Sequence, residues 1–218
     1  MNILNRLAHF QSRRDEEPNL ILAKELAEAR DTAGIREIAE NLWNENAEVQ
    51  SDCIKVLYEI GASEPGLIAG YAGEFLKLLG SKNNRLVWGG MTALAAALAP
   101  DAVAGVAEGG AAELFKNWQT IREAVETGSV ITADQGILAL ARIAATDAAR
   151  RKAIFPYLLK HLAACRSKDV PQRAEKIAPA ADASNRAAFV AALEKRMGEL
   201  SAAQAARVKK VIKQAGAA

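Results

Sequence analysis

The chain has 218 residues, half of them apolar, which is enough to bury a sizeable core as one domain. Aromatic residues make up only 5% and alanine dominates the apolar set. Strands prefer β-branched and aromatic residues, whereas alanine is the best helix former, so this composition favours an all-α fold. No stretch approaches the roughly 18 apolar residues of a spanning helix, which excludes a membrane-spanning protein.

Charge is unevenly distributed along the chain, although the formal net charge is only +2. Residues 1–148 carry 13 Lys/Arg against 21 Asp/Glu, a charge of −8, and residues 149–218 carry 15 against 5, a charge of +10. Such a split steers an acidic partner toward the C-terminal third. The simpler explanation is a solvated basic surface on the last helices.

The N-terminal segment has apolar residues at helical spacing, namely Ile3, Leu4, Leu7 and Phe10. It lacks the uninterrupted apolar run of a secretory signal. We expect residues 1–30 to form capping helices that cover the end of the domain, with a membrane-surface or targeting helix as the alternative. The two cysteines form no CxxC pair, which fits a reducing compartment, so we expect a cytoplasmic protein.

Helix boundaries are marked by capping residues and helix breakers. Pro18 begins the first helix, Asp31 or Thr32 the second and Asn46 the third, which Gly61 closes. Residues 100–110 are glycine-rich and predict a long loop, and Pro156 either begins or kinks its helix. The predicted helices cover residues 18–30, 31–43, 46–61, 65–80, 83–100, 111–127, 129–146, 151–165, 171–182, 185–198 and 201–215, the last one opened by a Ser201-x-x-Gln204 capping box.

A helical pattern recurs four times, with a small residue followed at +3, +4 and +7 by apolar residues. The starts are 37, 46 and 38 residues apart, which is the period of a helix-pair solenoid, and the longer interval coincides with the loop at 100–110. Neither helix of a pair can bury its stripe alone, so neighbouring pairs must stack. The copies are Cys53, Val56, Leu57, Ile60; Gly90, Ala93, Leu94, Ala97; Gly136, Ala139, Leu140, Ile143; and Ala174, Ile177, Ala178, Ala181.

These repeats resemble the HEAT/armadillo family, whose second helices begin with Asp or Asn and carry an apolar residue, a small residue and an Ala-Leu pair. The matching residues are Asn46, Val49, Cys53 and Val56-Leu57, then Asn83, Leu86, Gly90 and Ala93-Leu94. The third copy is looser, Pro179 interrupts the fourth, and a fifth partial unit follows at Ala205, Val208 and Ile212. The resemblance implies an all-α fold, a right-handed α-solenoid (superhelix) of stacked antiparallel helix pairs with about four to five repeats. We expect a single domain over residues 1–218, with caps at 1–30, repeats at 31–182 and a C-terminal helix pair at 183–218.

The resemblance also implies a non-enzymatic scaffold that binds a protein or peptide on its concave face. Positions −2, +2 and +5 from each small residue point away from the stripe, which places Ser51 and most of the residues listed below on that face. Arg85 lies one turn before Trp88 on the same helix. Trp88 is the strongest candidate anchor for a partner, and packing under a neighbouring helix is its alternative. The partner-binding residues expected on the concave face are Lys55, Tyr58, Arg85, Trp88, Thr92, Asp134 and Lys176.

A basic cluster in the C-terminal third is the second candidate site, for an acidic partner. Phosphate contacts need only Lys or Arg on one face, so nucleic-acid binding through residues 149–218 is the alternative function. Few aromatic residues interleave with the cluster, which argues against stacking of single-stranded bases. The cluster comprises Arg150, Arg151, Lys152, Lys209, Lys210 and Lys213.

Enzymatic function has little support in the sequence. HEAT-type hydroxylases carry His-Glu dipeptides for iron, whereas His9 and His161 are the only histidines and neither precedes Glu. No phosphate-binding loop and no metal-ligand spacing occurs, so we expect no cofactor and no metal, with a lyase as the third candidate function. We predict that Trp43 and Trp118 lie in the core and that His161 is a surface or hydrogen-bonded histidine. The sequence leaves the oligomeric state open.

Overall fold

The computed structural model describes residues 3–108 and 112–217, and within them it contains helices and no strand. The chain divides into two compact units, residues 1–139 (unit 1) and 140–218 (unit 2), and each is described by itself. The boundary falls inside helix α9 (Val130–Thr146). The expectation of a single domain stays a prediction.

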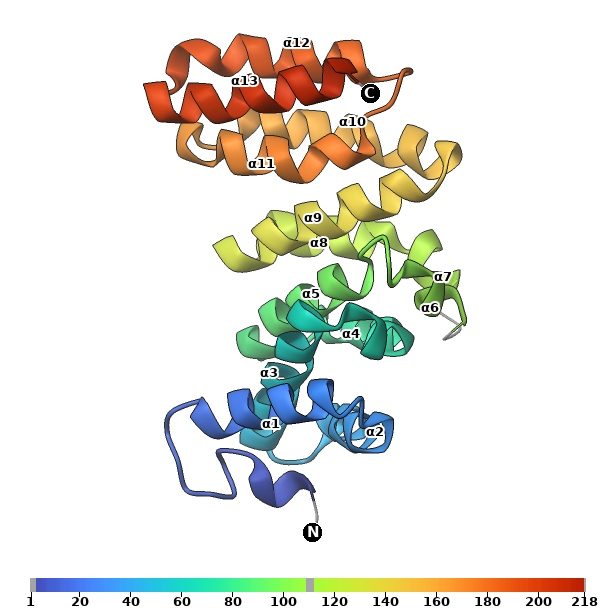
Figure 1. Cartoon of the computed structure of the whole chain (residues 1–218), viewed down its shortest axis with the longest axis vertical. Coiled ribbons are helices and arrows are strands. Elements are labelled where there is room, and N and C mark those ends of the chain that lie inside the picture. The colour runs from blue at the N-terminus through green and yellow to red at the C-terminus, as the bar shows by residue number, and fades with distance from the viewer. Residues whose placement is uncertain (1–2, 109–111, 218) are drawn as a thin grey trace. The chain divides into compact units, whose positions relative to one another are not determined.

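Unit 1 is built from helices, with 3-10 segments before α1, between α2 and α3 and between α3 and α4 (Figure 1). Helix α3 packs against α1 and against α5, while α2 and η2 pack on α3 and α4 packs on α5. The repeated second helices therefore neighbour one another, and the first helices lie against them. The elements are η1 (Ile3–Arg6), α1 (Glu17–Glu28), α2 (Thr32–Glu40), η2 (Asn41–Trp43), α3 (Ala47–Ser63), η3 (Pro65–Leu67), η4 (Ala69–Tyr71), α4 (Ala72–Leu78), α5 (Asn84–Ala97), α6 (Val103–Glu108), α7 (Ala112–Lys116), α8 (Trp118–Thr127) and α9.

The repeated stripe is the core of unit 1, as predicted. Cys53, Val56, Leu57 and Ile60 on α3 are all fully buried. The equivalent residues of α5 and the first part of α9 are buried as well. Burial of this apolar surface, at roughly 25 cal/mol per Å², is what holds each second helix against its neighbours.

Helix α1 carries a further copy of the stripe that the sequence pattern did not predict. Leu22, Ala23 and Leu26 are buried, and the position of the small residue is taken by Asn19, which is fully buried. The Asn19 side chain accepts a hydrogen bond from the Ala8 amide at 3.0 Å and donates one to Asp52 at 2.7 Å. The oxygen and the nitrogen of the Asn19 side-chain amide each have a hydrogen-bond partner, so this polar residue is tolerated in the buried stripe. Helix α1 therefore takes the position of a second helix.

The predicted N-caps are confirmed. The side chains of Asp31, Asn46 and Asn83 each accept a hydrogen bond from a backbone amide of the first helical turn, at 2.9–3.0 Å. Gly61, in contrast, does not end its helix, since α3 continues to Ser63. A Cβ at Gly61 would lie 2.4 Å from the Ile68 side chain, so glycine is needed there for close packing rather than for a helix end.

Predicted segments in the middle of the chain differ from the structure. The helix predicted over 65–80 is divided into η3, η4 and α4, and the helix predicted over 111–127 breaks at Asn117 between α7 and α8. The predicted loop at 100–110 contains α6, which packs against η4 and buries Val106 completely, so this segment belongs to the core. Residues 109–111 lie outside the described part.

Unit 2 consists of two packed helix pairs, α10 against α12 and α11 against α13. Pro156 lies inside α10 rather than at its start. The fourth repeated helix, α11, ends before Pro179, where the 3-10 segment η6 follows. The Ser201–Gln204 capping box is formed, with amide hydrogen bonds of 2.9 and 3.4 Å. The elements are α10 (Ala148–Ala164), η5 (Ser167–Asp169), α11 (Val170–Ile177), η6 (Ala178–Ala180), α12 (Arg186–Arg196), η7 (Met197–Glu199) and α13 (Ala202–Ala217).

In α13 the burial pattern differs from the predicted partial unit. Val208 and Val211 are buried, whereas Ile212 is half-buried. The prediction is thus confirmed for Val208, and Val211 rather than Ile212 is the next buried residue of this helix, which packs against α11.

A buried arginine closes the C-terminal end of α10. The Arg196 guanidinium donates hydrogen bonds to the backbone carbonyls of Leu162, Ala163 and Cys165 at 2.7, 2.9 and 2.7 Å. The last carbonyls of a helix lack partners within the helix, and a cation also interacts favourably with this end of the helix dipole. Arg196 therefore ties α12 to α10.

Candidate partner-binding site

Four of the residues predicted for the partner-binding face come together on α3 and α5. The rings of Tyr58 and Trp88 lie 5.4 Å apart at an angle of 51°. The Lys55 ammonium lies 4.9 Å from the centre of the Tyr58 ring, within the range of a cation–π contact. Tyr58 and Trp88 are half-buried and Arg85 is exposed, so Trp88 both packs against a neighbouring helix and stays accessible.

Glu16, which the sequence analysis did not single out, links the two cations of this group. Its carboxylate forms ion pairs with Lys55, at 3.1 Å, and with Arg85. Glu59, one turn from Lys55, adds a second pair at 2.7 Å. We call the five residues Glu16, Lys55, Tyr58, Arg85 and Trp88 the aromatic cluster. Nothing local marks Glu16, because it precedes α1 and lies 39 residues from Lys55 in the sequence.

The electrostatics of the cluster follow from these contacts. Partial burial acts to raise the pKa of Glu16, but Lys55 and Arg85 outweigh it and the pKa is lowered. For Lys55, burial acts to lower the pKa, and hydrogen bonds to Glu59, Tyr58 and Glu16 raise it overall. Burial raises the pKa of Tyr58. Lysine and glutamate are thus both held in their charged forms beside the rings.

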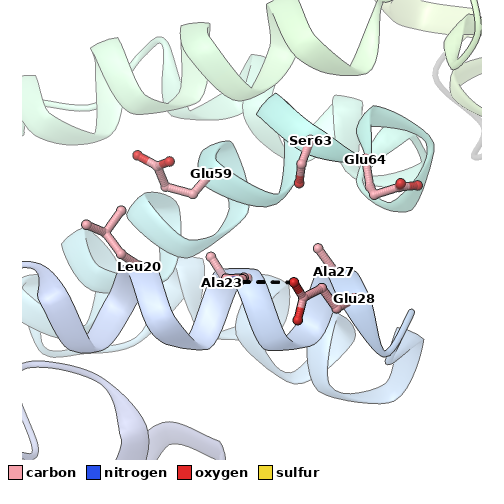
Figure 2. A pocket seen from close by; sticks show the side chains of 8 residues that line it. Leu20, Ala23, Ala27, Glu28, Glu59, Ser63 and Glu64 are labelled. Atoms are coloured by element: carbon pink, nitrogen blue, oxygen red, sulfur yellow. Dashed lines mark ion pairs between the residues drawn. The ribbon is translucent and has the colours of Figure 1, made fainter.

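A pocket of about 380 Å³ lies between α1 and the second half of α3 (Figure 2). In Figure 2, Leu20 of α1 lies across from Glu59 of α3, and Glu28 and Glu64 lie toward the other end. Leu20 is 43% exposed, and Lys24 pairs with Glu28 at 3.8 Å. Since Glu59 belongs to the pocket and also pairs with Lys55, the pocket adjoins the aromatic cluster. The lining residues are Leu20, Ala23, Lys24, Ala27, Glu28, Glu59, Ser63 and Glu64.

The remaining predicted residues of this face are placed differently. Thr92 is half-buried and donates its hydroxyl to the Trp88 carbonyl at 2.8 Å, which extends the cluster along α5. Ser51 is buried, with its hydroxyl bonded to the Ala47 carbonyl, so the expectation of an accessible Ser51 is wrong. Asp134 is half-buried on α9, and Lys176 is half-buried on α11 in unit 2, outside the unit that holds the cluster.

Two tryptophans predicted to lie in the core are not fully buried. Trp43 is 52% exposed, and its indole N–H donates to Glu74 at 2.8 Å. Trp43 ends the 3-10 segment η2, where the helical stripe no longer continues, and this explains the error. Trp118, the first residue of α8, is half-buried.

His161 is neither exposed nor hydrogen-bonded through its Nε2 atom, contrary to the prediction. The side chain is half-buried on α10, and Nε2 is buried without a partner. Burial, followed by the charge of Arg173, lowers the pKa of His161. The reason for the difference is that α11 packs against α10 at this point.

The predicted basic patch has two kinds of members. Arg150 pairs with Asp147 at 3.0 Å. Arg151 donates to the Ala180 carbonyl at 3.1 Å and to Asp182 at 2.7 Å, so it is part of the packing of unit 2. The exposed members, which are available to solvent, are Lys152, Lys209, Lys210 and Lys213.

Chemically reactive groups are sparse in the described part of the chain. Among those residues, no group of three or more His, Cys, Asp or Glu is arranged to hold a metal ion. Both cysteines are free, and burial raises the pKa of the Cys53 thiol to about 12, which keeps it protonated and unreactive. None of the described helices has the length and apolarity needed to cross a membrane.

No family model matches the sequence and no curated protein is similar to it, but solved structures are. An engineered protein shares 22% identity at a TM-score of 0.66, covering 99% of this chain and 98% of that one. A designed armadillo repeat protein in complex with the peptide (KR)4 shares 16% sequence identity at a TM-score of 0.68, and the match covers 89% of this chain and 85% of that one. A computationally designed armadillo repeat protein for modular peptide recognition shares 16% sequence identity at a TM-score of 0.67, and the match covers 98% of each chain. The chain therefore has an armadillo/HEAT-like repeat fold, an all-α solenoid.

Proposed function

We propose that the chain is a non-enzymatic scaffold that binds a protein or peptide partner on the second-helix face of unit 1. The observation that carries this proposal is the aromatic cluster, in which Tyr58 and Trp88 lie half-exposed between charged side chains. Large aromatic residues next to arginine are the side chains most enriched at binding hot spots. The repeat fold supports the proposal, because such scaffolds are generally binding folds.

The charge of unit 1 favours a partner segment that carries lysine or arginine. Residues 1–139 hold 12 Lys/Arg against 20 Asp/Glu, a formal charge of −8. Lys55 and Arg85 are balanced by Glu16 and Glu59. The adjoining pocket adds the carboxylates of Glu28 and Glu64, which form exposed ion pairs with Lys24 at 3.8 Å and with Arg30 at 2.8 Å. A basic side chain would lay its apolar stem against the rings and its charge toward these carboxylates. The designed neighbour bound to (KR)4 is consistent with this chemistry.

The proposal is tested by titrating the full chain with labelled (KR)4 and with a (DE)4 peptide of the same length, followed by fluorescence anisotropy. We expect (KR)4 to bind more tightly than (DE)4, and we expect its affinity to fall as the salt concentration is raised. Glu28→Gln should weaken binding, and Glu45→Gln, an exposed charge outside the pocket, serves as the matched control. If (DE)4 binds as tightly as (KR)4 or more tightly, the proposed preference for a basic partner segment is wrong.

Nucleic-acid binding through unit 2 is the second candidate function. The observation in its favour is the charge of +10 over residues 140–218, from 16 Lys/Arg against 6 Asp/Glu, together with the exposed lysines of α13. Arg150 and Arg151 contribute less, because both are engaged in ion pairs within the unit. Titration with single-stranded and duplex oligonucleotides at two salt concentrations tests this candidate, and no binding at low salt ends it. A cytoplasmic location stays a prediction.

A further inference from the structure

Unit 2 contains a groove that the proposed function does not use. It has a volume of about 530 Å³, within the range of roughly 300–1,000 Å³ that is typical of ligand-binding clefts. Residues of α10 form one wall, and α12 with the turn before it forms the other. The lining residues are Ala148, Arg151, Lys152, Phe155, Pro156, Leu159, Asp182, Ser184, Asn185 and Ala188.

The groove has an apolar floor. Phe155 is buried beneath it, Leu159 is half-buried, and Pro156 and Ala188 are exposed. Proline has no N–H, so Pro156 cannot donate the helical hydrogen bond that the Lys152 carbonyl would otherwise accept.

The rim of the groove is fixed by hydrogen bonds. Arg151 is held by the Ala180 carbonyl and by Asp182. Asp182 in turn accepts the backbone N–H of Ser184 at 2.9 Å and its hydroxyl at 2.6 Å, and the Asp182 amide donates to Asn185 at 2.9 Å. A rim that is already ordered loses little conformational entropy when a ligand binds.

The charge of the rim selects the sign of the ligand. Asp182 balances Arg151 at 2.7 Å, so the exposed Lys152 gives the rim its net positive charge. Unit 2 as a whole carries +10. We propose that this groove binds an acidic peptide segment of a partner protein, with one large apolar side chain of the segment on Phe155, Pro156 and Leu159 and its carboxylates beside Lys152. The proposal is independent of the function proposed for unit 1.

Three labelled peptides test the proposal in fluorescence-anisotropy titrations of the full chain: Glu-Asp-Phe-Asp-Glu, the same peptide with a central Ala, and the same peptide with Lys in place of the acids. We expect the first to bind, the central Ala to cost about tenfold in affinity because the apolar anchor is lost, and the lysine peptide not to bind. Equal binding of the Phe and Ala peptides would reduce the interaction to net charge and overturn the proposal.

Variants locate the binding. Ala188→Trp fills the groove and should cost at least tenfold, whereas Ala187→Trp, an exposed neighbour on α12 that does not line the groove, should have no effect. Lys152→Ala should lower the affinity for the Phe peptide several-fold more than Lys160→Ala does. Lys160 is an exposed lysine of the same helix that lies outside the groove. Circular dichroism checks the fold of each variant. Equal effects within either pair would overturn the proposal.

Discussion

The ring of Tyr58 on α3 rests against the ring of Trp88 on α5, with their centres 5.4 Å apart. The two residues come from successive repeats, so this contact joins two second helices across the face that the repeat leaves outside its core. Trp88 contacts the Tyr58 ring and is half-buried. A rigid, half-exposed aromatic surface of this kind binds a partner at low entropic cost.

Truncation of Trp88 should lower stability only moderately. A fully buried aromatic residue replaced by alanine costs about 3–5 kcal/mol, and the half-buried Trp88 should cost about 1–2 kcal/mol, most of it from the lost contact with Tyr58. Urea denaturation of Trp88→Ala measures this value. A loss as large as that of a fully buried aromatic residue would show that Trp88 belongs to the core.

Substitution of Gly61 by alanine should destabilise unit 1, although alanine is the better helix former. The new Cβ would lie 2.4 Å from Ile68 and 3.0 Å from Ala96, so the fully buried Ile68 side chain or α3 must shift, at a cost of about 1–3 kcal/mol. Gly73→Ala on α4 is the control, because a Cβ there meets nothing within 4 Å. Thermal melting should separate the two variants, and equal melting temperatures would contradict the close packing described for Gly61.

Arg196→Met should destabilise unit 2 by about 3 kcal/mol, because the carbonyls of Leu162, Ala163 and Cys165 lose their donor while they remain partly buried. The control is Arg207→Met, which removes only an exposed pair with Glu175 and should cost about 1 kcal/mol or less. Chemical denaturation compares the two. A smaller loss for Arg196→Met than for Arg207→Met would disprove the capping role.

Stability should fall as the pH is lowered through the range in which an unfolded histidine becomes protonated. Burial and the charge of Arg173 lower the pKa of His161 from 6.5, so the unfolded state binds a proton before the folded state does. The stabilising contribution is present above about pH 6.5 and is lost as the pH falls toward the folded-state pKa. His161→Gln should flatten the dependence of the free energy of unfolding between about pH 7 and pH 5.5. If the slope of the free energy of unfolding against pH is unchanged in this variant, the pH dependence comes from groups other than His161.

The local signals in the sequence predicted most helix starts and the core stripe, because caps and 3.6-residue periodicity are local properties. Asn46 and Asn83 cap their helices, and Cys53 and Leu57 are buried as expected. The copy on α1 was missed because Asn19 is polar, and only its hydrogen bond to Asp52, 33 residues away, makes its burial acceptable.

The candidate site was predicted in part. Positions relative to the stripe brought Lys55, Tyr58 and Trp88 to one face, since helical geometry alone determines that direction. The same rule placed Ser51 there, but Ser51 is buried and its hydroxyl donates to the Ala47 carbonyl. Glu16 was not predictable from the pattern, because its pairs with Lys55 and Arg85 depend on how α1 lies beside α3.

Binding of a partner at the aromatic cluster is tested by a comparison of two tryptophan variants. The (KR)4 peptide is titrated into the wild-type chain, Trp88→Ala and Trp43→Ala, which removes an exposed tryptophan outside the cluster. We predict that Trp88→Ala weakens binding by about tenfold or more and that Trp43→Ala leaves it unchanged. No binding to the wild type, or equal affinities for both variants, would rule out the aromatic cluster as the binding site.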